Sequence, residues 1–230
     1  MAEGAIFLNS GPLFSADRLE ALDSMPEWEQ IEEDAKLAFI RVKEAFEKHA
    51  TLLAGRPSAE ETRFFMVNPT LHALGFMHSV QEPIEVAPEH VARVDYALFG
   101  NHVHFLDAEP ARGTMSFFHD CLAVTRAVEW AHDLEQGAAE GEEEGAIQPA
   151  QELDLLLTAT SLDYGILTNG CDWRLYHRAT SGLLNTWFQA DMIAAIKSDF
   201  EDFKRFYLLF RREAFVKGDS GESFLDTMLQ

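Results

Sequence analysis

The chain has 230 residues, of which 47% are hydrophobic, and it carries 39 acidic side chains against 18 basic ones, for a formal net charge of −21. This composition excludes a disordered protein, and it excludes a self-sufficient DNA-binding protein because the field of the whole molecule repels nucleic acid. There is no apolar run of about 18 residues, so no membrane partner is expected. The two cysteines, Cys121 and Cys171, have no CxxC partner, which predicts free thiols in a cytoplasmic protein.

The first strong pattern predicts one long amphipathic helix over residues 24–54. Apolar side chains recur at helical spacing through this segment. Ser24 and Glu27 stand at the spacing of a capping box, so the helix is expected to begin there.

A second helix is predicted over residues 58–74. Ser58 and Glu61 again have the spacing of a capping box, and Gly75 is placed to end the helix. Pro69 lies inside the pattern, which predicts a kink or a break because proline removes a helical hydrogen bond.

Three strands are predicted next, over residues 78–87, 92–99 and 102–109, with Gly100 and Asn101 as turn formers between the last two. The remaining predicted elements follow in chain order: a helix over 114–135, an exposed acidic loop over 136–148, a helix over 149–160, strands over 163–170 and 173–178, and helices over 189–198 and 199–215. This order predicts a mixed α/β fold of the α+β kind without an internal repeat.

Two aspartates near the strand ends predict a metal site. Asp95 and Asp107 lie on the second and third predicted strands, and carboxylates are the ligands that Mg²⁺ prefers. A two-residue turn between the strands would point them to opposite faces, whereas a three-residue turn through His102 would place them on one face. Glu109 shares the face of Asp107 in either case, as a third ligand or as a solvated residue at the strand end.

Two further sets of residues are candidates for the site. Glu61 is a possible metal ligand from the second helix, although its spacing from Ser58 also fits a helix cap. Six basic residues form the densest positive material, either as a local phosphate-contacting surface or as partners of the many carboxylates. They are Arg174, Arg178, Lys204, Arg205, Arg211 and Arg212.

Five blocks of the chain, "GPLFSADRLE…MPEWEQ", "EETRFFMVNPTLHALGF", "RVDYALF", "YGILTNGCDWRLYHR" and "FYLLFRREAFV…SFLDTMLQ", resemble the N-terminal part of single-chain type IIG and IIL restriction–modification enzymes and of related phage-defence methyltransferase proteins. The resemblance runs from about Leu13 to the C-terminus. It implies a restriction-endonuclease-like PD-(D/E)xK domain, a mixed sheet flanked by helices. The implied parts are an N-terminal helical extension (1–57), the nuclease-like core (58–180) and C-terminal helices (181–230) that lead to a missing methyltransferase domain.

The resemblance also assigns residues to a nuclease site. Asp95 matches the family's metal-binding aspartate on the second strand, and Asp107 matches the acidic residue on the third strand. Glu109 stands where the family has a lysine, and a glutamate there adds repulsion toward phosphate. The family's QxxxY element has Glu152 and Leu156 at its two places. These departures imply that metal-dependent cleavage is weakened or lost.

The sequence therefore leads to two main hypotheses. The first is a DNA-processing nuclease-like domain of a restriction or defence system, which would use Mg²⁺ if it is active and would contact DNA only through a local basic surface. The second is a non-catalytic scaffold that docks a DNA methyltransferase or another defence protein. A third reading, a DNA mimic, rests on the charge alone. S-adenosylmethionine is not expected to bind within this chain, because no glycine-rich motif for it is present.

Overall fold

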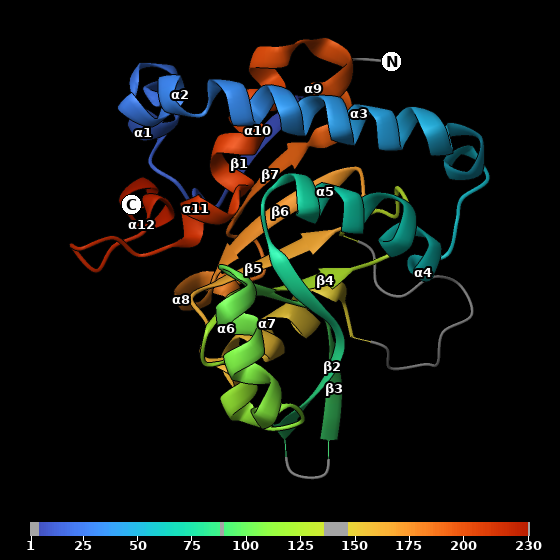
Figure 1. Cartoon of the computed structure of the whole chain (residues 1–230), viewed down its shortest axis with the longest axis vertical. Helices are drawn as coiled ribbons and strands as arrows, with labels where there is room; N and C mark the ends of the chain where they lie inside the picture. The colour runs from blue at the N-terminus through green and yellow to red at the C-terminus, as the bar shows by residue number, and fades with distance from the viewer. Residues whose placement is uncertain (1–4, 88–89, 136–146, 230) are drawn as a thin grey trace.

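A computed structural model describes residues 5–87, 90–135 and 147–229. Seven strands form one mixed sheet in the order β1-β7-β6-β5-β4-β3-β2, in which the β4–β5 pair is parallel and the other pairs are antiparallel (Figure 1). The strands are β1 (Phe7–Ser10), β2 (Met77–Ala87), β3 (His90–Phe99), β4 (Cys121–Ala127), β5 (Tyr164–Thr168), β6 (Asp172–His177) and β7 (Trp187–Asp191). The predicted α+β fold class is confirmed.

Helices cover both faces of this sheet. The longer ones are α3 (Glu32–Ala54), α5 (Asn68–Ala73), α6 (His102–Ala108), α7 (Pro149–Thr160), α9 (Met192–Ser198) and α10 (Phe200–Phe210). The shorter ones are α1 (Ala16–Glu20), α2 (Pro26–Gln30), α4 (Ala59–Thr62), α8 (Arg178–Ser181), α11 (Arg212–Phe215) and α12 (Phe224–Met228). Four single turns complete the elements of the described residues: η1 (Leu22–Ser24), the π-helical η2 (Arg63–Val67), η3 (Glu109–Ala111) and η4 (Met115–Phe118).

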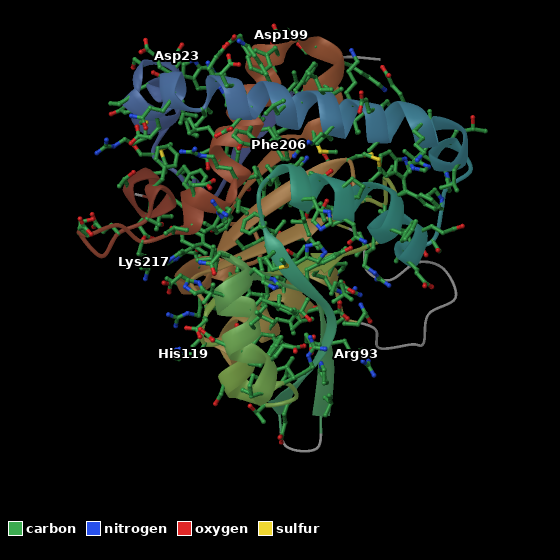
Figure 2. All side chains as sticks on the ribbon, in the orientation of Figure 1. Asp23, Arg93, His119, Asp199, Phe206 and Lys217 are labelled. Atoms are coloured by element: carbon green, nitrogen blue, oxygen red, sulfur yellow. The ribbon has the colours of Figure 1, made fainter. Side chains whose placement is uncertain are left out.

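Each face of the sheet has its own apolar core. One core lies under α3, α5 and α10, and the other lies under α6, η4 and α7. Neighbouring residues of β5 alternate between them, because Ile166 joins the first core and Leu167 the second. Phe206 of α10 is fully buried in the first core, whereas Asp23 and Asp199 lie at the surface (Figure 2).

The strand predicted over 102–109 is wrong, because this segment forms α6 and the start of η3. The side chain of Asn101 accepts a hydrogen bond from the His104 N–H at 2.9 Å and thereby caps the helix. Phe105 and Ala108, three residues apart, face the second core. The segment is therefore helical, and the hairpin that would have carried Asp107 does not form.

The helix predicted over 114–135 is also wrong. After η4 the chain forms strand β4, which lies between β3 and β5 and is covered on both faces. A strand that is buried on both faces does not alternate between apolar and polar residues. Its continuous apolar run therefore also fits the apolar spacing of a helix. Strands β1 and β7, at the other end of the sheet, were not predicted at all; β7 occupies the start of the helix predicted over 189–198.

The predicted helix over 58–74 is confirmed in its start and its break, whereas the predicted helix over 24–54 is confirmed only in part. The capping box between Ser58 and Glu61 is formed, and the break expected at Pro69 is the π-helical turn η2 followed by α5. The predicted helix over 24–54 is interrupted at Ile31 and forms α2 and α3. The side chain of Ser24 does not cap α2 but donates a hydrogen bond to the Ala21 carbonyl. Residues 136–146 of the predicted acidic loop lie outside the described residues.

Candidate functional site

The best-connected polar side chain of the sheet is Asp95 on β3, which is only 2% exposed. Its Oδ1 accepts hydrogen bonds from Arg63 Nη1 at 3.1 Å and from Gln81 Nε2 at 2.5 Å, and its Oδ2 accepts from Arg126 Nη1 at 2.6 Å and from the Ala127 N–H at 2.8 Å. A buried carboxylate requires this many donors because it has lost its hydration. Four elements therefore meet at Asp95: η2, β2, β3 and β4.

The pairing of β3 with both neighbouring strands is interrupted at Asp95. The β3–β4 register ends at the Tyr96–Thr125 pair, so beyond it the Asp95 carboxylate, rather than a strand carbonyl, binds the Ala127 N–H. On the other side, Gln81 has a left-handed backbone with φ of 57°, which interrupts the β2–β3 ladder and turns its side chain to the carboxylate. Strained residues of this kind persist where the surroundings hold them, and they gather at ligand sites.

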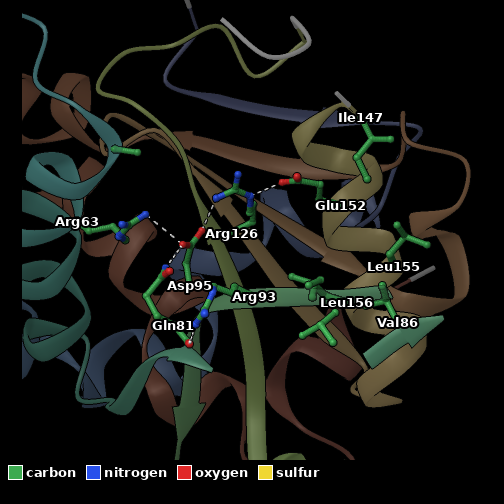
Figure 3. Close-up of a pocket in the computed structure, with 13 residues that line it drawn as sticks. Arg63, Gln81, Val86, Arg93, Asp95, Arg126, Ile147, Glu152, Leu155 and Leu156 are labelled. Carbon is green, nitrogen blue, oxygen red and sulfur yellow. Dashed lines mark hydrogen bonds and ion pairs between the residues drawn. The ribbon is translucent and has the colours of Figure 1, made fainter. Parts of the chain in front are cut away.

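Arg126 bridges two carboxylates. One end of its guanidinium binds Asp95, and its Nε donates to Glu152 of α7 (Figure 3). Burial acts to lower the pKa of Arg126, but the two carboxylates outweigh it and raise the pKa above its ordinary value. Arg126 is thus a permanent cation, fixed between Asp95 and Glu152.

These residues form one wall of a pocket of about 470 Å³. The polar wall contains Arg63, Gln81, Arg93, Asp95, Arg126 and Glu152 (Figure 3). The larger apolar residues of the lining, here called the apolar wall, are Val86, Val91, Ile147, Leu155 and Leu156. Three positive side chains against two negative ones leave one net positive charge in the described lining. This pocket is therefore locally positive in a chain whose net charge is −21.

The other acidic candidates do not line this pocket. Asp107 is exposed on α6, and Glu109 binds Arg112 at 3.4 Å. Glu61 is exposed and accepts hydrogen bonds from the backbone and hydroxyl of Ser58, as the capping interpretation predicts. Of the proposed metal ligands, the structure brings Asp95 alone to the pocket.

The donor set of the pocket does not fit a magnesium ion. Both oxygens of Asp95 already accept hydrogen bonds from cationic or amide donors, and the second carboxylate, Glu152, is bound to Arg126. In the described parts of the chain, no group of three or more His, Cys, Asp or Glu side chains is placed to hold a metal. A guanidinium therefore stands between the two carboxylates, where a divalent cation would need to be.

The six predicted DNA-contacting residues differ in their burial, and two of them are not at the surface. Arg174 and Lys204 are buried, and each stacks over a tryptophan and pairs with a glutamate. Arg178 and Arg212 also have acidic partners. Arg205 of α10 lies over the ring of Phe7 of β1, and Arg211 follows α10 in the chain. Four of the six basic residues, Arg174, Arg178, Lys204 and Arg212, therefore have the acidic partners that the ion-pairing alternative expects.

Sequence reasoning found Asp95 but missed Arg63, Gln81 and Arg126. These three come from separate elements, and Arg126 lay in a segment predicted to be helical. One signal in the sequence did indicate this part of the pocket. Glu152 and Leu156, at the two places of the QxxxY element, lie one turn apart on α7, and both line the pocket.

Comparisons were made with protein-family models, curated proteins and solved structures, and no match was found in any of them. The fold and the site alone therefore define the class of protein: an α+β domain with a seven-stranded mixed sheet and a carboxylate held by arginines. Among the described helices, none has the length and apolar character that crossing a membrane requires. Cys121 and Cys171 are free thiols.

Proposed function

We propose that this chain is a restriction-endonuclease-like domain of a restriction–modification or phage-defence protein that does not cleave DNA. The observation that carries the proposal is the environment of Asp95. This residue lies on the second strand of an antiparallel run, β2–β3–β4, as the family's metal-binding aspartate does, yet arginines hold it.

The third strand of this run supports the loss of cleavage. Helix α6 takes the segment that was matched to the third strand, so the strand that pairs with β3 is β4, with the sequence CLAVTRA. This strand contains neither a carboxylate nor a lysine. Arg126 is the charged side chain of β4 that reaches Asp95, and it neither binds a metal nor deprotonates water at neutral pH.

A nicking assay on supercoiled plasmid tests the proposal. The expected result is no nicking with Mg²⁺ or Mn²⁺, and no gain in the Glu109→Lys variant, because residue 109 lies on η3 and does not line the pocket. Metal-dependent nicking by the unaltered chain that disappears in Asp95→Ala would overturn the proposal. A methyltransferase sequence in the reading frame downstream of Gln230, or in an adjacent gene, is the expected genetic context.

A second function, the docking of a protein partner, is favoured by the ion pairs of the basic residues. Because Arg174, Lys204 and Arg178 are bound to carboxylates, these three residues have little positive charge left for phosphates. Co-purification with the adjacent methyltransferase at 0.15 M salt, and the absence of a DNA gel shift, are the expected results. A gel shift that is lost in Arg178→Gln would contradict this second function.

A further inference from the structure

We propose that the pocket beside Asp95 binds an aliphatic monocarboxylate, with the carboxylate at the arginines and the chain against the aliphatic wall. The two walls require different chemistry. One wall has three guanidinium groups, and the other has five aliphatic side chains. This inference goes beyond the proposed function, because it does not depend on any relation to nucleases.

Unused donors make the polar wall suitable for an anion. Arg93 donates through Nη1 to the Gln81 carbonyl at 3.2 Å, and within the described residues its Nε and Nη2 donate to no protein group. Nη2 of Arg126 and Nη2 of Arg63 are likewise without a partner in the described parts of the chain. A guanidinium binds a carboxylate through two parallel hydrogen bonds, so these donors fit that head group.

Charge selects a monoanion. The described lining carries three positive and two negative side chains, so one negative charge on the ligand makes the pocket neutral. A dianion, such as a phosphate monoester, would leave an excess negative charge inside a chain whose net charge is already −21. A carboxylate is therefore favoured over a doubly charged phosphate.

The apolar wall selects an aliphatic body. Val91 is 63% exposed, Ile147 41% and Leu155 40%, and all three border the pocket. Covering these side chains with an alkyl chain removes apolar surface from water. No aromatic side chain is among the described residues of the lining, so a nucleobase would find no ring to stack on. The volume of about 470 Å³ is ample for a chain of eight carbons.

Two sources can supply this chemistry, a free alkanoic acid or the C-terminal aliphatic residue of a polypeptide. Isothermal titration calorimetry of the whole chain at 0.15 M salt distinguishes them. One arm uses octanoate, with octanamide and acetate as matched ligands that lack the charge or the chain. The other arm uses a peptide ending in Val-Leu, as the free acid and as the amide.

In at least one arm, we expect the charged ligand to bind about tenfold or more tightly than its uncharged match. The free energy of a hydrogen bond to a charged group corresponds to a difference in affinity of at least this size. In the octanoate arm, acetate should also bind more weakly than octanoate. Tighter binding of octanoate than of the peptide identifies a free acid, and the reverse identifies a polypeptide C-terminus. Equal binding of the charged and uncharged ligands in both arms, or no binding of any of them, overturns the inference.

Two variants locate the site. Arg93→Gln and Leu155→Ser change exposed side chains on the two walls and should each weaken the binding about tenfold while the circular dichroism spectrum is unchanged. Arg178→Gln and Leu106→Ser are matched controls, because they change an exposed arginine and an exposed leucine that do not line the pocket. Unchanged affinity in both wall variants would place the ligand elsewhere and overturn the inference. The nicking assay has no bearing on these outcomes, so each proposal can fail alone.

Discussion

Arg126 of β4 joins Asp95 of β3 to Glu152 of α7, with its Nη1 at 2.6 Å from Asp95 Oδ2. The bridge ties the sheet to the helix that connects its parallel strands, β4 and β5. Since Asp95 is buried, the bridge also contributes to stabilising its negative charge.

The first prediction concerns the loss of this bridge. Arg126→Ala should lower the free energy of unfolding by about 2 to 3 kcal/mol, because the buried carboxylate of Asp95 loses the nearer of its two arginine partners. Urea denaturation measures the change. Arg178→Ala is the control: it removes an exposed ion pair with Asp163 and should cost less than about 1 kcal/mol. Equal losses in the two variants would show that Arg126 does not stabilise Asp95.

The second prediction concerns Arg112 and treats Glu109 as a solvated residue that contributes little to stability. Arg112 lies between Glu109 and the buried Glu82, with 3.4 Å to each carboxylate. Arg112→Ala should cost about 2 kcal/mol, because Glu82, only 4% exposed, loses its cationic partner. Glu109→Gln removes a solvated pair and should cost less than about 1 kcal/mol. Thermal unfolding of both variants provides the comparison, and a larger loss for Glu109→Gln would contradict the assignment.

The sequence predicted best the helices over 58–74 and 149–160, whose apolar pattern and end signals agree. The helix over 58–74 had apolar periodicity, a capping box at Ser58 and a glycine at its end, and the helix over 149–160 began with a proline. The segments over 102–109 and 114–135 were assigned the wrong type because short apolar runs fit both periods. Their true structure depends on tertiary contacts: β4 is a strand because β3 and β5 pair with it on either side.

The same reason limits what could be predicted of the site. Asp95 was identifiable because it is a lone carboxylate in an apolar strand. Its partners Arg63 and Arg126 lie 32 and 31 residues away in the chain, and nothing in the local pattern relates them to it. Asp107 was assigned to the site through a turn that does not form, since Asn101 caps a helix there. Asp95 and Asp107 are the same type of residue, so only the long-range contacts of the fold determine that Asp95 lies at the site and Asp107 does not.

The third prediction concerns the turn "TNG" between β5 and β6. Asn169 is 1% exposed; its Oδ1 accepts from the N–H groups of Cys171 at 2.8 Å and Asp172 at 2.7 Å, and its Nδ2 donates to the His132 carbonyl at 2.7 Å. Asn169→Ala should therefore cost about 3 kcal/mol, because the variant leaves several buried groups without partners. Hydrogen exchange at Cys171 and Asp172 should accelerate by the corresponding factor, and unchanged exchange there would contradict the role of the turn.

Gly170 in the same turn provides a test with an internal control. Its φ is +84°, and an added Cβ would lie 2.7 Å from the ring of Trp130. Gly113 has nearly the same φ, +83°, with no atom within 4 Å of an added Cβ. Gly113→Ala should cost about 1 kcal/mol from backbone strain alone, and Gly170→Ala should cost about 1 to 3 kcal/mol more from overpacking. Equal costs from chemical denaturation would exclude a tight contact with Trp130.

The last prediction is a pH dependence that arises from His78. Burial, and secondarily the neighbouring His72, lowers the pKa of His78 from 6.5 to about 4. The ring centroid of His78 lies 5.0 Å from that of His72 and 5.2 Å from that of Tyr96, and within the described residues its Nδ1 has no hydrogen-bond partner. The native state therefore disfavours the protonated imidazole, whereas the unfolded chain binds the proton below pH 6.5.

Because folding lowers the pKa of His78, the contribution of its neutral imidazole to the free energy of unfolding is fully present above pH 6.5. This contribution is lost as the pH falls toward 4. Over that interval the loss should reach about 3 kcal/mol. Carboxylates titrate in the same range, so the measurement is the difference between the unaltered chain and His78→Gln, followed by urea denaturation at several pH values. His119→Gln, which changes a histidine whose side chain is 86% exposed, should retain the full slope. A slope that is unchanged in His78→Gln would show that this imidazole is free to take up its proton in the folded protein.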